Sequence, residues 1–190
     1  MWKSYFKSTK NNPPNKLLVL ANAVPYVNGK KALDLGAGTL NDSKYLVEQG
    51  FTVDAVDSAP EFVTYALKEK NPLIHIHNYS FSDFPFPPDT YDLISAQWAL
   101  SFEAPNRFDT LIANIRKALK PGGIFTGHIY GNRHAWASSR STMTFKDNFW
   151  YQYNFQPLWH SIYSKEVEEI QTPVVGKPGK FHYWEFVMQK

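Results

Sequence analysis

The strongest constraint on the fold comes from residues 30–46, KKALDLGAGTLNDSKYL. A short apolar run stops at an acidic residue, turns through two glycines and enters a segment with helical spacing. A strand that passes through a glycine turn directly into a helix is typical of the first unit of an α/β sheet, and such a turn brings backbone N–H groups close to a ligand. The sequence therefore predicts an α/β fold with a ligand at this turn.

Strand-like and helix-like segments alternate along most of the chain. The predicted strands are 31–36, 51–57, 73–79, 91–96 and 124–131, and the predicted helices are 15–24, 41–50, 58–70 (with a capping box at Ser58–Glu61) and 105–120. Alternation with short turns predicts a parallel sheet covered by helices on both faces. Residues 159–172 and 180–190 predict a closing antiparallel hairpin. We expect one domain, 1–190, with an N-terminal helical segment at 1–28.

Composition excludes several classes of protein. The 190 residues contain no cysteine, which removes disulfides, thiolate metal sites and cysteine nucleophiles. The net charge of +3 is modest and no basic helix stands out, so we expect no nucleic-acid partner. No stretch reaches the roughly 18 apolar residues of a membrane span, and the polar start does not have the pattern of a signal peptide. We expect a soluble, cytoplasmic protein with no membrane partner.

The glycine turn differs from that of a dinucleotide-binding protein. Gly36, Ala37 and Gly38 match the first two glycines of the G-x-G-x-x-G fingerprint, but Asn41 stands where the third glycine belongs. Asp57 follows Gly36 by 57 − 36 = 21 residues, the separation at which an acid reaches a ribose. Asp34 beside the turn would repel a pyrophosphate and favour a cation. These features favour a nucleoside cofactor without phosphate over a nicotinamide reductase.

Three segments and one acid resemble a single enzyme class: the segments ALDLGAG, PPDTYDLISAQ and LKPGG, and the acid Asp57. Together they look like the class I methyltransferases that use S-adenosylmethionine and release S-adenosylhomocysteine. The resemblance implies a Rossmann-like, doubly wound, seven-stranded sheet, mostly parallel, with an antiparallel C-terminal strand and three αβα layers. Residues 29–57 also look like the branch that contains tellurite-resistance and thiopurine methyltransferases. IYGNRHAW, TMTF and FHYWEFVMQK are similar to the tellurite-resistance type, with Asn132 and His134 as departures.

The resemblance carries functional roles onto particular residues. The glycine turn would hold the methionine end of the cofactor, Asp57 the ribose, and Ser80 with Phe81 the adenine. Asp83 is either an adenine contact or a solvated loop acid, and Trp98 either faces the sulfonium or the substrate with its ring or packs in the core. The full set of predicted cofactor contacts is Asp34, Gly36, Ala37, Gly38, Asp57, Ser58, Ser80, Phe81, Asp83, Gln97 and Trp98.

Residues 126–163 are unusually aromatic, with ten aromatic side chains among 38 residues. Because they follow the fifth predicted strand, they are placed to cover the carboxyl ends of the strands as a lid, together with Trp2 and Tyr5. For any single ring, packing on a helix or on the hairpin is an equal alternative. Tyr5, Arg133 and Trp136 are the predicted substrate contacts, and the basic rim suits a small anionic, thiol or chalcogen acceptor.

Methyl transfer from a sulfonium is an in-line displacement, so the protein mainly has to align the reactants and exclude water. A soft anion needs no general base, whereas a hydroxyl or amine acceptor does, and His128 and His134 are the candidates. His75 and His77 share one strand face without a third ligand, so no metal site is predicted. We predict S-adenosylmethionine-dependent methylation of a small molecule. The alternative is an inactive methyltransferase-like module that binds the cofactor or a partner.

Overall fold

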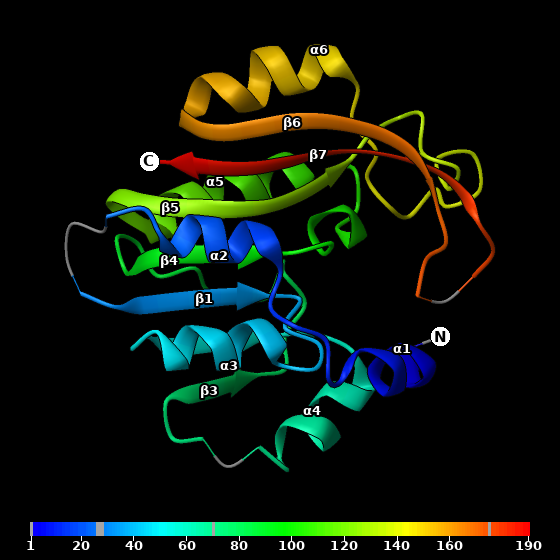
Figure 1. Ribbon diagram of the computed structural model, residues 1–190. Helices are drawn as coiled ribbons and strands as arrows, with labels where there is room; N and C mark the ends of the chain where they lie inside the picture. Colours follow the sequence, from blue (N-terminus) through cyan, green and yellow to red (C-terminus); the bar gives the residue numbers. More distant parts are fainter. Residues whose placement is uncertain (1, 26–28, 70, 175) are drawn as a thin grey trace.

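The computed structural model describes residues 2–25, 29–69, 71–174 and 176–190. Its core is one seven-stranded sheet in the order β3-β2-β1-β4-β5-β7-β6, shown in Figure 1. Strands β1 to β5 are parallel, and β7 runs antiparallel to both β5 and β6. The strands are β1 Lys31–Leu35, β2 Thr52–Val56, β3 Ile74–His77, β4 Tyr91–Ala96, β5 Leu119–Tyr130, β6 His160–Gln171 and β7 Gly179–Gln189.

Helices cover both faces of this sheet. They are α1 Trp2–Thr9, α2 Lys16–Asn22, α3 Asn41–Glu48, α4 Pro60–Ala66, α5 Phe108–Ala118 and α6 Asn148–Trp150, which continues into a π turn at Tyr151–Phe155 and a 3-10 turn at Gln156–Leu158. A further 3-10 turn, Leu100–Phe102, follows β4. Helices α2 and α3 pack on one face, whereas α5 and the turns after α6 pack on the other. This arrangement confirms the predicted fold.

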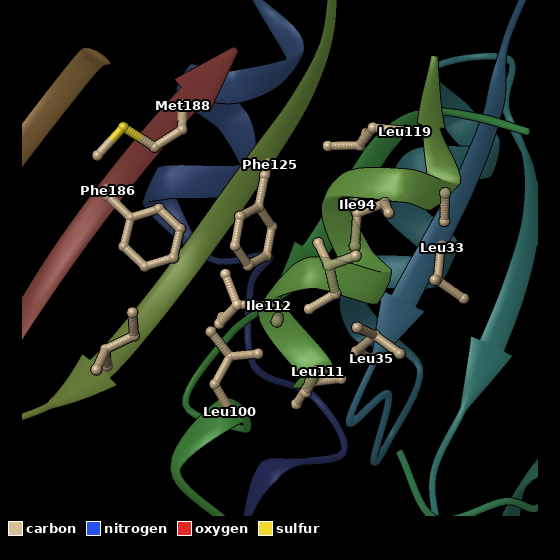
Figure 2. Close-up of a cluster of buried hydrophobic side chains, with 14 of the residues drawn as sticks. Leu33, Leu35, Ile94, Leu100, Leu111, Ile112, Leu119, Phe125, Phe186 and Met188 are labelled. Atoms are coloured by element: carbon tan, nitrogen blue, oxygen red, sulfur yellow. The ribbon is translucent and has the colours of Figure 1, made fainter. Parts of the chain in front are cut away.

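The core forms because successive strand residues point to opposite faces. Leu33 and Leu35 of β1 face α5, while Ala32, the residue before Leu33, faces α2. Figure 2 shows this α5 side, where Ile112 of α5 lies among apolar side chains of the central strands and Phe125 of β5. In β1 every residue after Lys31 is buried, as expected for a central parallel strand with a helix on each side.

Some element boundaries differ from the prediction. Helix α4 begins after its N-cap residue, Ala59, and no side chain caps its first turn. The predicted capping box at Ser58 is therefore wrong, because the helix starts one residue later than that box requires. Asp57 Oδ1 instead accepts a hydrogen bond from the Ala59 N–H at 2.7 Å. Helix α4 also ends at Ala66, earlier than predicted, and β5 starts at Leu119 rather than at residue 124. Part of the predicted 1–28 and 58–70 segments, residues 1, 26–28 and 70, lies outside the described residues.

The closing hairpin extends beyond the rest of the sheet. Strand β7 pairs with β5 only between residues 183 and 189, but its pairing with β6 continues to Gln171 and Gly179. The hairpin therefore projects past the carboxyl end of β5. Figure 1 shows the connection between β6 and β7 on the same side of the molecule as α1, beyond the arrowheads of the parallel strands. This end of the sheet is where open α/β proteins bind their ligands.

Candidate active site

The glycine turn after β1 is shaped by contact with the turn after β4. Gly36 has φ +78°, and a Cβ added to it would lie 2.4 Å from the Cβ of Ala99. The Gly36 and Ala37 N–H groups both donate to the Val56 carbonyl, at 2.8 and 3.1 Å. Gly38, with φ +46°, instead turns its N–H to Asp57 Oδ2 at 2.9 Å. The turn is therefore fixed by packing and hydrogen bonds before any ligand is considered.

Asp57 joins the glycine turn to the start of α4. One carboxylate oxygen accepts from the Gly38 N–H and the other from the Ala59 N–H. Burial raises the pKa of this carboxyl, although the two N–H donors act in the opposite direction. Each oxygen keeps a free lone pair after one such bond, so the carboxylate can still accept hydrogen bonds from a ligand diol.

Two more acids lie behind the glycine turn. Asp34, only 3% exposed, accepts a hydrogen bond from the Ser43 hydroxyl, and Asp42 accepts one from the Asn15 N–H at 2.8 Å. Burial, with the nearby charge of Asp42 and a smaller effect of Asp57, raises the pKa of Asp34 to about 8. Burial also raises the pKa of Asp42 to about 6. Burial is the main cause of both shifts, and a positive charge nearby would favour the ionised form of either carboxyl.

A cavity of about 400 Å³ opens at the carboxyl ends of the parallel strands. Its lining combines the glycine turn, the ends of β2 and β4, helix α1, the segment after β5 and the β6–β7 connection. The lining residues are Trp2, Tyr5, Phe6, Gly36, Gly38, Asp57, Ser58, Ser80, Phe81, Gln97, Trp98, Ala99, Phe102, Glu103, Arg107, Tyr130, Trp136, Arg140, Gln171, Thr172, Pro173, Val174 and Phe181. We define its glycine end by Gly36, Gly38 and Asp57, and its aromatic end by Tyr130, Trp136, Arg140 and Phe181.

Most of the predicted contacts lie on this cavity. From the cofactor set, the lining includes Gly36, Gly38, Asp57, Ser58, Ser80, Phe81, Gln97 and Trp98, and from the substrate set, Tyr5 and Trp136. Asp34, Ala37 and Asp83 are not among the lining residues. Asp34 and Ala37 are buried behind the turn, and the exposed Asp83 accepts a hydrogen bond from Ser80 at 2.6 Å.

Arg133 lies away from the cavity. Its guanidinium donates to Glu168 Oε2 at 2.6 Å and to Glu166 Oε1 at 2.7 Å, both on the outer hairpin strand. Arg140, on the same loop, does line the cavity, and its guanidinium lies 4.0 Å from the centroid of the Trp136 ring. No carboxylate within the described ranges pairs with Arg140, whereas Arg107 is paired with Glu103 at 3.0 Å.

Only the first part of the predicted lid, residues 126–163, covers the cavity. Tyr130, Trp136 and Arg140 line it. The later rings pack elsewhere, as Tyr151 stacks on Trp184 of β7 at 4.8 Å between centroids and Trp150 meets Phe108 of α5. For these rings, packing on a helix and on the hairpin is the arrangement that the structure shows. The other half of the cover is α1 together with the β6–β7 connection, residues 171–174.

The two candidate bases, His128 and His134, are buried outside the cavity lining. His128 stacks on Trp98, and burial lowers its pKa to about 3. His134 accepts a hydrogen bond from the Trp136 N–H through Nδ1, and burial, with His182 and Arg140 nearby, lowers its pKa to about 4. Both rings are therefore neutral at physiological pH, and neither reaches the space where an acceptor would lie.

The remaining histidines of interest bind a carboxylate. His75 Nδ1 and His77 Nε2 lie 3.2 and 3.1 Å from Asp54 Oδ1. The other oxygen of this carboxylate, Oδ2, accepts a hydrogen bond from the Tyr91 hydroxyl and forms an ion pair with Lys31. Within the described part of the chain, no group of three or more acidic or histidine side chains is arranged to hold a metal ion. None of the helices in the described ranges is long and apolar enough to cross a membrane.

Several lining residues were not among the predicted contacts. Glu103 is 4% exposed and accepts hydrogen bonds from Ser82 and Arg107. The Tyr130 hydroxyl has no hydrogen-bond partner among the described residues. Residues 171–174 reach the cavity only because the hairpin projects past β5. The density of aromatic residues indicated Tyr130, but no local pattern indicates the reach of the hairpin.

Comparison with known proteins agrees with this geometry. Residues 32–123 match the family model described as a methyltransferase domain. An uncharacterized methyltransferase from Synechocystis is 31% identical over 97 residues, which are 51% of this chain and 45% of that protein. The chain thus spans about half the length of this curated relative.

Two solved structures share the fold. TehB from Haemophilus influenzae superposes with a TM-score of 0.76 at 20% identity, over 100% of this chain and 67% of that one. The 1,6-didemethyltoxoflavin-N1-methyltransferase of Burkholderia thailandensis, solved with its substrate and S-adenosylhomocysteine, has a TM-score of 0.64 at 20% identity over 92% and 78% of the two chains.

The match covers the glycine turn, Asp57, strands β1 to β4 and the start of β5. The predicted Rossmann-like fold is confirmed. The match agrees with the predicted methyltransferase domain and with its cofactor, S-adenosylmethionine. The branch, the acceptor and the roles of single residues stay predictions. Residues 32–123 of this chain, just under half of its length, are similar to the methyltransferase domain family.

Proposed function

We propose that the chain binds S-adenosylmethionine at the glycine end of the cavity and transfers its methyl group to a small, negatively charged acceptor at the aromatic end. The observation that carries the proposal is that one continuous cavity joins these two ends. The glycine end has acids beside it, and the aromatic end carries Arg140, which pairs with no carboxylate among the residues that the structure describes. A cation and an anion would therefore meet inside a single enclosure.

The glycine end fits this cofactor in shape and in charge. Gly36 lets the turns after β1 and β4 approach each other closely, because any side chain there would overlap Ala99. Asp57 offers carboxylate oxygens to a ribose diol, and Ser80 and Phe81 lie on the lining beyond it. Asp34 and Asp42, with their raised pKa values, gain from a nearby positive charge, whereas a pyrophosphate would make the ionised form of either carboxyl still less favourable.

The aromatic end fits an anion that also has an apolar part. Trp136 and Phe181 offer ring faces, while Arg140 offers guanidinium donors that no carboxylate in the described ranges occupies. The Tyr130 hydroxyl has no hydrogen-bond partner in the described part of the chain, and burial raises its pKa, so it stays protonated and can donate to an anion. Thiolates and chalcogen oxyanions, the acceptors expected for the tellurite-resistance and thiopurine branch, satisfy these conditions.

Bound S-adenosylmethionine supplies an activated methyl group on a sulfonium. The residues of this chain have to place the acceptor in line with that group and exclude water, which lowers the entropic part of the barrier. Helix α1 and residues 171–174 cover the cavity and serve the exclusion of water. An anionic acceptor needs no base, which agrees with the burial of both His128 and His134 away from the lining.

Calorimetric titration with S-adenosylmethionine, S-adenosylhomocysteine and NADH tests the cofactor assignment. We expect both adenosyl ligands to bind and NADH not to bind; binding of NADH alone, or of none, would refute it. An acceptor screen with thiols and chalcogen oxyanions, followed through release of S-adenosylhomocysteine, then tests the reaction. Cofactor binding without turnover on anionic, neutral and amine acceptors alike would support the inactive-module alternative.

A further inference from the structure

The turn between β4 and the 3-10 helix that follows it connects the two ends of the cavity. Ala99 of this turn contacts Gly36 at the glycine end. The neighbouring Trp98 lines the cavity and contacts Tyr130 at the aromatic end, with ring centroids 6.1 Å apart. A methyl group that passes from one end to the other has to pass close to Trp98.

Trp98 holds a strained backbone conformation at this position. Its φ of +58° lies in the left-handed region, which is unfavourable for a bulky side chain. Strain of this kind persists only where the surroundings enforce it, and it is concentrated at functional sites. The conformation places the Trp98 indole against β5 while the next residue turns back to Gly36.

One face of the Trp98 indole is covered by His128. The two rings are nearly parallel, with centroids 3.6 Å apart and an angle of 13°, and the Tyr183 ring meets the indole edge-on at 4.8 Å. His128 is 3% exposed, and its Nδ1 is buried without a hydrogen-bond partner in the described residues. A histidine held here forms few polar contacts, so its main contact is the stack. No second ring among the described residues is stacked on the indole, and Trp98 lines the cavity, so its opposite face is the one left for a ligand.

We propose that Trp98 presents this free face to the sulfonium of bound S-adenosylmethionine and that His128 is the positioning residue that holds the indole in place. The proposal rests on the proposed function, which places the cofactor at the glycine end. An aromatic face attracts a cation, most strongly when water is excluded. S-adenosylhomocysteine has a neutral thioether at the same position, so the contact favours the substrate form of the cofactor over its product.

The first test compares the affinities of the two adenosyl ligands by calorimetry. In Trp98→Leu, which keeps an apolar side chain in the same strained turn, we expect S-adenosylmethionine to lose about tenfold more affinity than S-adenosylhomocysteine. Trp136→Leu, at the aromatic end of the same cavity, is the matched control and should keep the wild-type ratio. Equal losses for the two ligands in Trp98→Leu would overturn the proposal, since a purely structural role weakens both alike.

The second test examines His128. His128→Phe keeps an aromatic ring under the indole and should preserve the wild-type affinity ratio, whereas His128→Val removes the support and should lower the ratio towards that of Trp98→Leu. A catalytic base would behave differently, because turnover would fall in His128→Phe while the ratio stayed unchanged. An unchanged ratio in a folded His128→Val would overturn the positioning role.

A measurement on the wild-type protein decides the matter even if a variant does not fold. The methyl resonance of isotope-labelled S-adenosylmethionine should shift upfield on binding, because the ring current of an indole shields a group above its face. A saturated complex without this shift would overturn the contact. If wild-type protein binds neither adenosyl ligand, the proposed function itself fails, and this outcome is distinct from binding with an unshifted methyl resonance.

Discussion

Substitution of Gly36 by alanine should destabilise the protein through two separable effects. At φ +78° a residue with a Cβ costs about 1–2 kcal/mol relative to glycine. The added Cβ would also lie 2.4 Å from the Ala99 Cβ, closer than side chains ever approach, and overpacking of this kind costs about 1–3 kcal/mol. We therefore expect Gly36→Ala to lower the free energy of unfolding by about 2–5 kcal/mol.

The double variant Gly36→Ala/Ala99→Gly separates the two effects. Once the Ala99 Cβ is removed, the nearest atoms to the new methyl are the Ala99 Cα at 3.7 Å and a Phe81 ring carbon at 3.8 Å, which are ordinary contacts. The single variant Ala99→Gly should cost only about 0.5–1 kcal/mol. We therefore expect the double variant to be about 1–3 kcal/mol more stable than the sum of the two single effects predicts. The cost of the positive φ at residue 36 should remain in the double variant.

Urea denaturation of the four proteins, followed by circular dichroism, measures this coupling. Additive effects of Gly36→Ala and Ala99→Gly would refute the packing argument, because they would mean that the two turns adjust independently. Full recovery in the double variant would refute the backbone argument instead. Calorimetric titration of the folded double variant with S-adenosylmethionine also shows whether a glycine turn of the same shape, with the methyl group moved from residue 99 to residue 36, still binds the cofactor.

Three further predictions concern the cavity. Asp57→Ala should weaken the binding of S-adenosylmethionine by about 1.5–3 kcal/mol, the free energy that a hydrogen bond to a charged group contributes. An unchanged affinity in calorimetry would contradict the ribose contact. Because the pKa of Asp34 is raised to about 8, this carboxyl is protonated at pH 7 in the free protein and should release its proton when a cation binds. Affinity for S-adenosylmethionine should then rise between about pH 6 and 8, binding enthalpies at pH 7 should depend on the buffer's ionisation enthalpy, and Asp34→Asn should remove both effects. Arg140→Gln should raise KM for an anionic acceptor identified by screening and should leave the cofactor affinity unchanged. Arg133→Gln is the control and should leave KM unchanged, because Arg133 is already paired with two glutamates. Equal effects of the two variants would refute the placement of the anion.

The sequence was sufficient where a local pattern controls the structure. The buried strand before Gly36 and the spacing to Asp57 predicted both the sheet and the glycine end of the cavity, because the turn, the strand end and the acid belong to one βαβ unit. The start of α4 was predicted one residue too early, because the spacing from Ser58 to Glu61 has the pattern of a capping box while the N-cap residue is Ala59. The Asp57 carboxylate instead joins the Gly38 N–H to the Ala59 N–H, a link that the local pattern does not indicate.

Where long-range pairing decides, the sequence was insufficient. Arg133 and Arg140 lie on the same loop but differ in their contacts, because Glu166 and Glu168 of β6 pair with Arg133 while Arg140 lines the cavity. The register between β6 and β7, which sets that reach, has no local sequence signal. The burial of His128 depends likewise on the strained turn at Trp98, a conformation that no propensity favours for tryptophan.

The cover of the cavity is built from residues near opposite ends of the chain, Trp2 and Tyr5 of α1 and residues 171–174 of the hairpin connection. During synthesis the glycine turn and Asp57 leave the ribosome long before residues 171–174 do. The glycine end of the cavity can therefore form in a nascent chain before the cavity is covered. A ligand that needs the enclosed cavity can be retained only by a chain that has closed its last hairpin. Ligand retention would thus report that the whole sheet has assembled, and so distinguish finished molecules from partly folded ones.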